Sequence, residues 1–217
     1  MYKDNFTVSI GDEKIECNSF SLNDYTKLLF ARSSEDSRLI KHWMNEILKT
    51  HTTMIDFTKH KAELVIVHLI AKSLNEKIPV QEYVCECGNE IETPININQT
   101  YIDYNKSNEK LVYAFKNFKI KLKYPQLFED DNVADMLIKS IEAVYVGEER
   151  IELDDLSENE LNDLYNAILP SDMDNIANIL LEPKVKLGVS ISCKKCGKNH
   201  VHAITGFKEF IRILEWA

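Results

Sequence analysis

The sequence has no apolar run of the roughly 18 to 20 residues that a membrane-spanning helix requires. No apolar signal-peptide core follows its first residues, Met1 to Asn5. Positive charge is also scarce, because 26 Lys and Arg stand against 35 Asp and Glu, a net charge of −9. Phosphate contacts need clustered Lys and Arg, so broad nucleic-acid binding is disfavoured. We therefore expect a cytoplasmic protein, unless a larger particle carries it out of the cell, with no membrane partner.

Motifs of common enzyme classes are absent as well. There is no phosphate-binding glycine loop, no nucleophile elbow in a Ser–His–Asp order and no HExxH. Adjacent acids such as Asp154 and Asp155 are more typical of a solvated surface than of a catalytic pair. The sequence therefore predicts a protein that is not an enzyme and takes no small-molecule substrate.

The acidic residues that the chain does have are unevenly distributed. Between Gln126 and Pro183 there are sixteen Asp and Glu against two Lys and Arg. Such a segment is commonly a solvated acidic face. The alternative hypothesis is a docking face for a basic partner.

Hydrophobic periodicity predicts an N-terminal hairpin followed by helices. Phe6, Val8 and Ile10 alternate before a turn at Gly11 and Asp12, and Ile15 continues the pattern. Ser21 with Asp24 resembles a capping box at the start of a helix. Apolar residues at helical spacing follow from Leu39 to Leu48, and a segment from Lys59 to about Asn75 is apolar nearly all round. That last helix is expected to be central.

The following region mixes strand and helix patterns. Residues 118–124 alternate between apolar side chains and lysines, which predicts a half-buried strand. Val133, Met136, Leu137, Ile141 and Val144 are in helical register, and a short strand interrupted by Gly147 is expected at 144–153. Ser157 with Glu160 forms a second capping box.

Four of the five cysteines form two close pairs, each followed by glycine. These are Cys85 and Cys87 before Gly88, and Cys193 and Cys196 before Gly197. Each pair lies between two strand-like runs, which is typical of a zinc knuckle whose glycine permits a turn with positive φ. Two knuckles supply the four soft ligands of a tetrahedral zinc ion. The sequence therefore predicts a structural zinc site with no open position for catalysis.

Other interpretations of the cysteines fit less well. A disulfide between Cys85 and Cys87 would be strained, and a cytoplasm disfavours disulfides. A redox Cys-x-x-Cys belongs at a helix start, whereas the residues after Cys196 resemble a turn. His200 and His202 follow on one strand face, and either could replace a cysteine ligand. The usual alternative for both is a surface histidine or a partner of a ligand.

About 105 residues separate Cys87 from Cys193, whereas an ordinary zinc ribbon has about 15 to 20 there. The fold class that we predict is therefore α+β, with an N-terminal hairpin and helical region at 1–80 and a split zinc-ribbon domain at 81–217. A mixed α/β acidic insert at 99–183 lies inside that ribbon. A C-terminal amphipathic helix presents an apolar stripe that we expect to pack on the ribbon and to contribute to partner binding, with Trp216 at an accessible edge. The stripe consists of Phe207, Phe210, Ile211, Leu214 and Trp216.

An ordered set of motifs resembles a known family. In sequence order they are the run His68 to Ser73, Val84 to Gly88, Lys119 to Pro125, Ser140 to Glu149, Cys193 to Gly197 and Gly206 to Phe210. Their order and the chain length resemble the baseplate hub subunits of T-even-like contractile-tailed bacteriophages. The resemblance covers the chain from about residue 55, whereas the first 50 residues match in general character.

This resemblance implies a structural or assembly role in the phage tail baseplate. Its partners would be other tail and hub proteins, and its place would be the host cytoplasm during assembly and the virion baseplate if the protein is retained there. By position, the metal ligands would be Cys85, Cys87, Cys193 and Cys196, with a first knuckle shorter than the usual Cys-x-x-Cys. The alternative function is a zinc-ribbon regulator that binds nucleic acid. Its support is a lysine cluster near the second knuckle, Lys194, Lys195 and Lys198, together with the strand lysines Lys119, Lys121 and Lys123.

Overall fold

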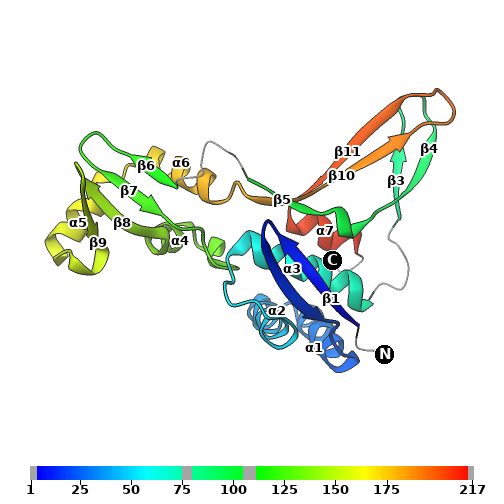
Figure 1. The fold of residues 1–217 in the computed structure, drawn as a ribbon, viewed down its shortest axis with the longest axis horizontal. Coiled ribbons are helices and arrows are strands. Elements are labelled where there is room, and N and C mark those ends of the chain that lie inside the picture. The colour runs from blue at the N-terminus through cyan, green and yellow to red at the C-terminus, as the bar shows by residue number, and fades with distance from the viewer. Residues whose placement is uncertain (1–3, 75–79, 105–110, 215–217) are drawn as a thin grey trace. The chain divides into compact units, whose positions relative to one another are not determined.

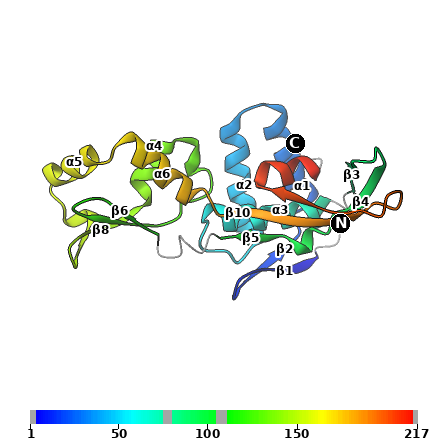
Figure 2. The same ribbon diagram turned by 90° about the horizontal axis from the view of Figure 1, so that it is seen from above.

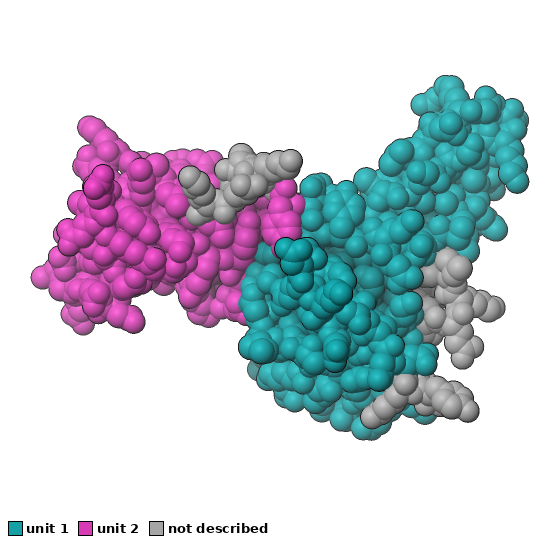
Figure 3. All heavy atoms as spheres, in the orientation of Figure 1, with its two compact units in different colours: residues 1–103, 184–217 teal, residues 104–183 magenta. Residues whose placement is uncertain are grey.

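The computed structural model describes residues 4–74, 80–104 and 111–214. The chain forms two compact units (Figure 3), unit 1 from residues 1–103 and 184–217 and unit 2 from residues 104–183. Both contain helices and small antiparallel sheets, so the predicted α+β class is confirmed. Within the described ranges, no helix is long and apolar enough to cross a membrane. The boundary expected near residue 80 stays a prediction; the N-terminal helices and both cysteine pairs belong to unit 1.

The N-terminal part of unit 1 follows its hydrophobic pattern closely. Strands β1 (Asn5–Ile10) and β2 (Glu13–Asn18) form the predicted hairpin, with Val8 opposite Ile15. Helices α1 (Leu22–Ser33), α2 (Ser37–His51) and α3 (Lys59–Leu74) follow. Ser21 and Asp24 make the predicted capping box at the start of α1. Asn75, where the pattern of the third helix ends, lies outside the described residues.

Helix α3 is the centre of unit 1. Every side chain from Ala62 to Ile70 is buried. The helix contacts α2, α7, β1, β5 and β10, and Figure 2 shows α2 and the β1–β2 hairpin on its two sides. Because it is surrounded, the helix carries apolar residues nearly all round, as its sequence predicted.

The remaining elements of unit 1 are two hairpins, a short strand and a helix. Strands β3 (Val80–Val84) and β4 (Glu90–Pro94) form one antiparallel pair, and η1 (Ile97–Gln99) follows. Strands β10 (Lys184–Ser192) and β11 (Asn199–Thr205) form the second hairpin, to which β5 (Tyr101–Asp103) adds along β10. Helix α7 (Phe207–Ile213) closes the described chain. The two hairpins run side by side with their turns at the same end (Figure 1).

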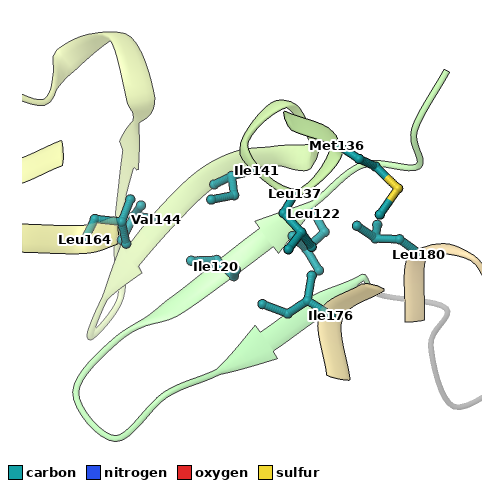
Figure 4. Close-up of a cluster of buried hydrophobic side chains, with 9 residues drawn as sticks. All are labelled: Ile120, Leu122, Met136, Leu137, Ile141, Val144, Leu164, Ile176 and Leu180. Carbon is teal, nitrogen blue, oxygen red and sulfur yellow. The ribbon is translucent and has the colours of Figure 1, made fainter. Parts of the chain in front are cut away.

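Unit 2 is a four-stranded antiparallel sheet covered by helices. Its strands, in sheet order, are β6 (Val112–Ala114), β7 (Lys119–Leu122), β8 (Ile141–Val146) and β9 (Glu149–Glu152). The helices are η3 (Glu129–Asp131), α4 (Val133–Ser140), η4 (Leu153–Asp155), α5 (Glu158–Ala167) and α6 (Pro170–Leu180). The second predicted capping box, Ser157 with Glu160, starts α5. Figure 4 shows the core between sheet and helices, where Ile120 and Leu122 meet Met136, Ile176 and Leu180.

One predicted element differs in unit 2. Ile141 lies in β8 and not in the helix that contains Met136 and Leu137, because α4 ends at Ser140. The strand expected from Val144 and interrupted at Gly147 is present as the end of β8 and as β9. Strand β8 pairs with β7 on one side and β9 on the other. Its β-branched residues suit a strand, and two ladders of hydrogen bonds outweigh the helical spacing of its apolar side chains.

Shortening Leu122 should destabilise unit 2. Its side chain is 1% exposed and belongs to the core in Figure 4. We expect Leu122→Ala to reduce the free energy of unfolding of this unit by about 2 to 5 kcal/mol, measured by hydrogen exchange of its backbone amides in urea. The control Lys119→Ala, on the same strand but exposed, should change it by less than about 0.5 kcal/mol. Equal effects of the two variants would contradict this account of the core.

Candidate metal centre

Each cysteine pair lies in a tight turn between two antiparallel strands. The first turn joins β3 to β4, where the N–H of Cys85 donates to the Asn89 carbonyl at 2.9 Å and that of Gly88 donates to the Cys85 carbonyl at 2.8 Å. Gly88 has φ +77°, a conformation that side chains with a Cβ rarely adopt. The turn therefore needs its glycine, as predicted.

The second turn, between β10 and β11, repeats this pattern. The N–H of Cys193 donates to the Lys198 carbonyl at 2.9 Å, and that of Gly197 donates to the Cys193 carbonyl at 2.8 Å. Gly197 has φ +74°. Although the first turn is one residue shorter between its cysteines, both turns direct two sulfurs toward the same point.

The four sulfurs form one compact group. The Sγ atoms of Cys85, Cys87, Cys193 and Cys196 all lie within 4.8 Å of one another. Two of the separations, Cys85 to Cys196 and Cys87 to Cys193, are 3.7 Å. A zinc ion with four Zn–S bonds of about 2.3 Å holds its sulfurs about 3.8 Å apart. The cysteines are therefore close enough, and spaced suitably, to hold one metal ion, and none of them is in a disulfide.

The thiols of this group differ in their tendency to ionise. The backbone N–H groups of Cys196 and Lys195 donate toward Cys193, which lowers the pKa of the Cys193 thiol to about 6. The N–H of Cys87 favours the thiolate of Cys85, but burial and the neighbouring sulfurs outweigh it and raise the pKa of Cys85 to about 12. Four thiolates this close repel one another, so a bound cation is what would allow all of them to ionise together.

Two polar contacts join the turns. The first matches the interpretation of His200 as a partner of a ligand, and the second was not predicted. The Nε2 atom of His200 lies 3.3 Å from the Cys85 sulfur. Lys198 pairs with Glu86 at 2.7 Å, across the two turns. His200 and His202 alternate on one face of β11, and both rings contact Tyr83. Among the described residues the compact group consists of the four cysteines, and His200 lies against it. The alternation of His200 and His202 beside a knuckle was the one signal for this contact.

The C-terminal helix packs inward through part of its apolar stripe. Phe210 and Leu214 are 0% and 3% exposed, and α7 contacts α3 and β11. Phe207 and Ile211 are half-buried. Trp216 lies outside the described residues. Partner binding by this stripe stays a prediction. Within the described helix, Phe207 and Ile211 are the members of the stripe that a partner could reach, because Phe210 and Leu214 are buried.

Comparison with known proteins agrees with the motif order. The family model described as T4 bacteriophage base plate protein matches residues 1–212. The chain belongs to this family. The match extends the resemblance noted in the sequence to the N-terminal 50 residues, and it confirms that resemblance.

A relative within the T4 base plate protein family matches over its whole length. The chain is 39% identical over 214 residues to the baseplate hub assembly protein gp26 of Enterobacteria phage T4, covering 99% of this chain and 100% of the relative. No solved structure matches the chain.

Proposed function

We propose that this protein is an assembly subunit of a contractile phage tail that acts on the baseplate hub by binding other tail proteins, without catalysis. The observation that carries the proposal is the end-to-end relationship to a protein named for hub assembly. Its partners are other baseplate hub proteins. Its place is the host cytoplasm while the baseplate is built, and the virion baseplate if it is retained.

The cysteine group has a structural part in this proposal. Four thiolates fill the coordination shell of a zinc ion and leave no site for a reacting water. The zinc ion then ties the β3–β4 turn to the β10–β11 turn and completes a split zinc ribbon. The spacing of the sulfurs and the two glycine turns support zinc as the ion.

A phage that lacks this chain should fail to complete its baseplate. In infected cells we expect the other hub proteins to accumulate without complete baseplates, as judged by sedimentation and electron microscopy of lysates. Supplying the wild-type chain, or its Cys17→Ala variant, from a plasmid should restore assembly. Cys17 is buried and lies outside the metal group, so it is a suitable control. A normal yield of complete baseplates without the chain would contradict the proposed function.

A further inference from the structure

Unit 2 has an apolar groove on its helical side. The groove measures about 130 Å³, and it is lined by Ile120 of the sheet, Ala134 and Ile138 of α4, Tyr165 of α5, Ile168, and Met173 of α6, among others. Apart from the Tyr165 hydroxyl, every lining side chain is apolar. Its floor is the core in Figure 4, where Ile120, Leu137, Ile141 and Ile176 lie together.

Apolar side chains are also exposed in the lining of this groove and next to it in sequence. Ile138 is 46% exposed, and Leu169, which follows the lining residue Ile168, is 59% exposed. Ala134 and Ile138 are four residues apart on α4 and therefore share one face of that helix. A partner that covered this face would remove apolar surface from water, which is the main source of stabilisation in protein association.

The helical segments that contribute to the groove are strongly acidic. The helical segments of unit 2, residues 126–140 and 153–183, contain twelve Asp and Glu and a single basic residue, Lys139. Lys139 is itself 3.8 Å from Glu129. The lysines of β7 alternate with the buried Ile120 and Leu122 and so lie on the other face of the sheet, where Lys121 pairs with Glu142.

This charge is a property of unit 2 alone. Residues 104–183 contain seventeen Asp and Glu and eight Lys and Arg, so unit 2 accounts for the whole net charge of −9. Unit 1 is balanced. A partner for the groove must therefore supply apolar side chains and tolerate, or use, a negative surface.

We propose that this groove binds a basic amphipathic helix of another baseplate hub protein. Apolar side chains at i, i+3 and i+4 of that helix enter the groove, as in other helix-in-groove complexes. Its flanking Lys and Arg face the acidic residues of the helical segments, which speeds encounter and selects against acidic partners. The identity of the partner as a hub protein rests on the proposed function, whereas the groove and its charge do not.

The test uses the full-length zinc-loaded chain and a designed probe. The probe is a peptide of about 18 residues, about 27 Å long as a helix, with Leu at i, i+3, i+4 and i+7 and Lys at the other positions. A second peptide has Glu in place of every Lys. Binding is measured by isothermal titration calorimetry, and oligomeric state by native mass spectrometry. We expect the Leu/Lys peptide to bind, more weakly at higher salt, and the Leu/Glu peptide not to bind.

Two matched variants separate the groove from general charge attraction. Ile138→Asp places a carboxylate at the groove, whereas Val112→Asp makes the same kind of change on β6. Val112 lies opposite Lys121, on the face of the sheet that carries the lysines. The two side chains are 46% and 43% exposed, and both changes add one negative charge. We expect Ile138→Asp to weaken binding of the Leu/Lys peptide by about tenfold or more and Val112→Asp to weaken it by less than about twofold.

Several results would overturn the proposal. The first is equal affinity of both variants for the Leu/Lys peptide, and the second is equal binding of the two peptides. The third is a wild-type chain that forms a dimer through the groove, together with an Ile138→Asp variant that is a monomer. If the groove fails this test while the phage still needs the chain to complete its baseplate, the groove is wrong and the proposed function stands. If the peptide binds but the phage does not need the chain, the groove stands and the proposed function is wrong.

Discussion

Removing the zinc ion that we propose for the cysteine group should release the β3–β4 hairpin from the β10–β11 hairpin. A structural zinc contributes about 10 to 16 kcal/mol of apparent binding free energy in small zinc-binding peptides. The ion pair between the two turns, Glu86 with Lys198, is exposed, and an exposed ion pair stabilises a fold only weakly. We therefore expect chelation to abolish hydrogen-exchange protection at the amides of Gly88 and Gly197, both of which are hydrogen bonded in the turns.

Native mass spectrometry gives the stoichiometry that this prediction requires. The wild-type chain and Cys17→Ala should each retain one zinc ion, and Cys87→Ala should lose it after dialysis at neutral pH. The core of α3 and the whole of unit 2 should keep their exchange protection, because neither depends on the turns. A Cys87→Ala chain with a full complement of zinc would refute the four-cysteine site.

Acid should destabilise unit 1 through two buried histidines of α3. His60 and His68 are 3% and 8% exposed. Burial lowers the pKa of each to about 4, and the nearby Lys61 and Lys72 respectively add to the effect. The unfolded chain takes up protons at these groups near its ordinary pKa of 6.5, whereas the folded chain takes them up only near 4. The contribution of each histidine to the free energy of unfolding is therefore fully present above about pH 6.5. It falls as the pH drops toward 4, by about 3 kcal/mol for each histidine.

The variant His68→Gln isolates one of these contributions. The Nε2 atom of His68 lies 2.8 Å from the Thr100 hydroxyl, which itself donates to the Ile97 carbonyl. The histidine must then donate through Nε2–H, and the amide of Gln can do the same. Urea unfolding at pH 7 and pH 4.5 should show a smaller acid-induced loss of stability in His68→Gln than in the wild type. The exposed His42→Gln should behave as the wild type, and an unchanged loss in His68→Gln would contradict the assignment.

Much of unit 1 could be predicted from local sequence. Alternation identified the β1–β2 hairpin, and Ser21 with Asp24 marked the start of α1. The cysteine pairs with their glycines predicted two similar turns, because only a few backbone conformations direct two sulfurs to one point. The meeting of the two turns could be argued from chemistry alone, since four thiolates suit one tetrahedral ion.

Pairing between distant strands could not be read in the same way. Ile141 fits a helix by spacing, and only the ladder with β7 places it in a strand. The partnership of β5 with β10 was equally invisible, and it changes the energetics of the metal site. Because Asp103 pairs with Lys184, the loop from Cys87 to Cys193 is already shortened to about 25 residues. Closing it costs about 3.5 kcal/mol, rather than the 4 to 5 kcal/mol of a loop of about 100 residues.

The groove of unit 2 also has no signature in the sequence. Ile138 and Met173 fit the apolar stripes of two different helices, and spacing along the chain does not say that these stripes leave a space between them. The acidity of the segment and the lysine face of the strand at 118–124 were visible in the sequence, but not that this face lies opposite the groove. That separation follows from the alternation of β7 once the sheet is known.

The pairing of Asp103 with Lys184 has a further consequence. Opposite residues in an antiparallel ladder have Cα atoms about 5 Å apart, a gap that a two-residue turn spans. The 80 residues of unit 2 thus begin and end next to each other, at the pair formed by Asp103 and Lys184. A segment of this kind can be exchanged between related genes, or deleted, without breaking a hydrogen bond of the β5–β10 ladder. The cysteine-bearing scaffold and the acidic module are therefore free to evolve at different rates.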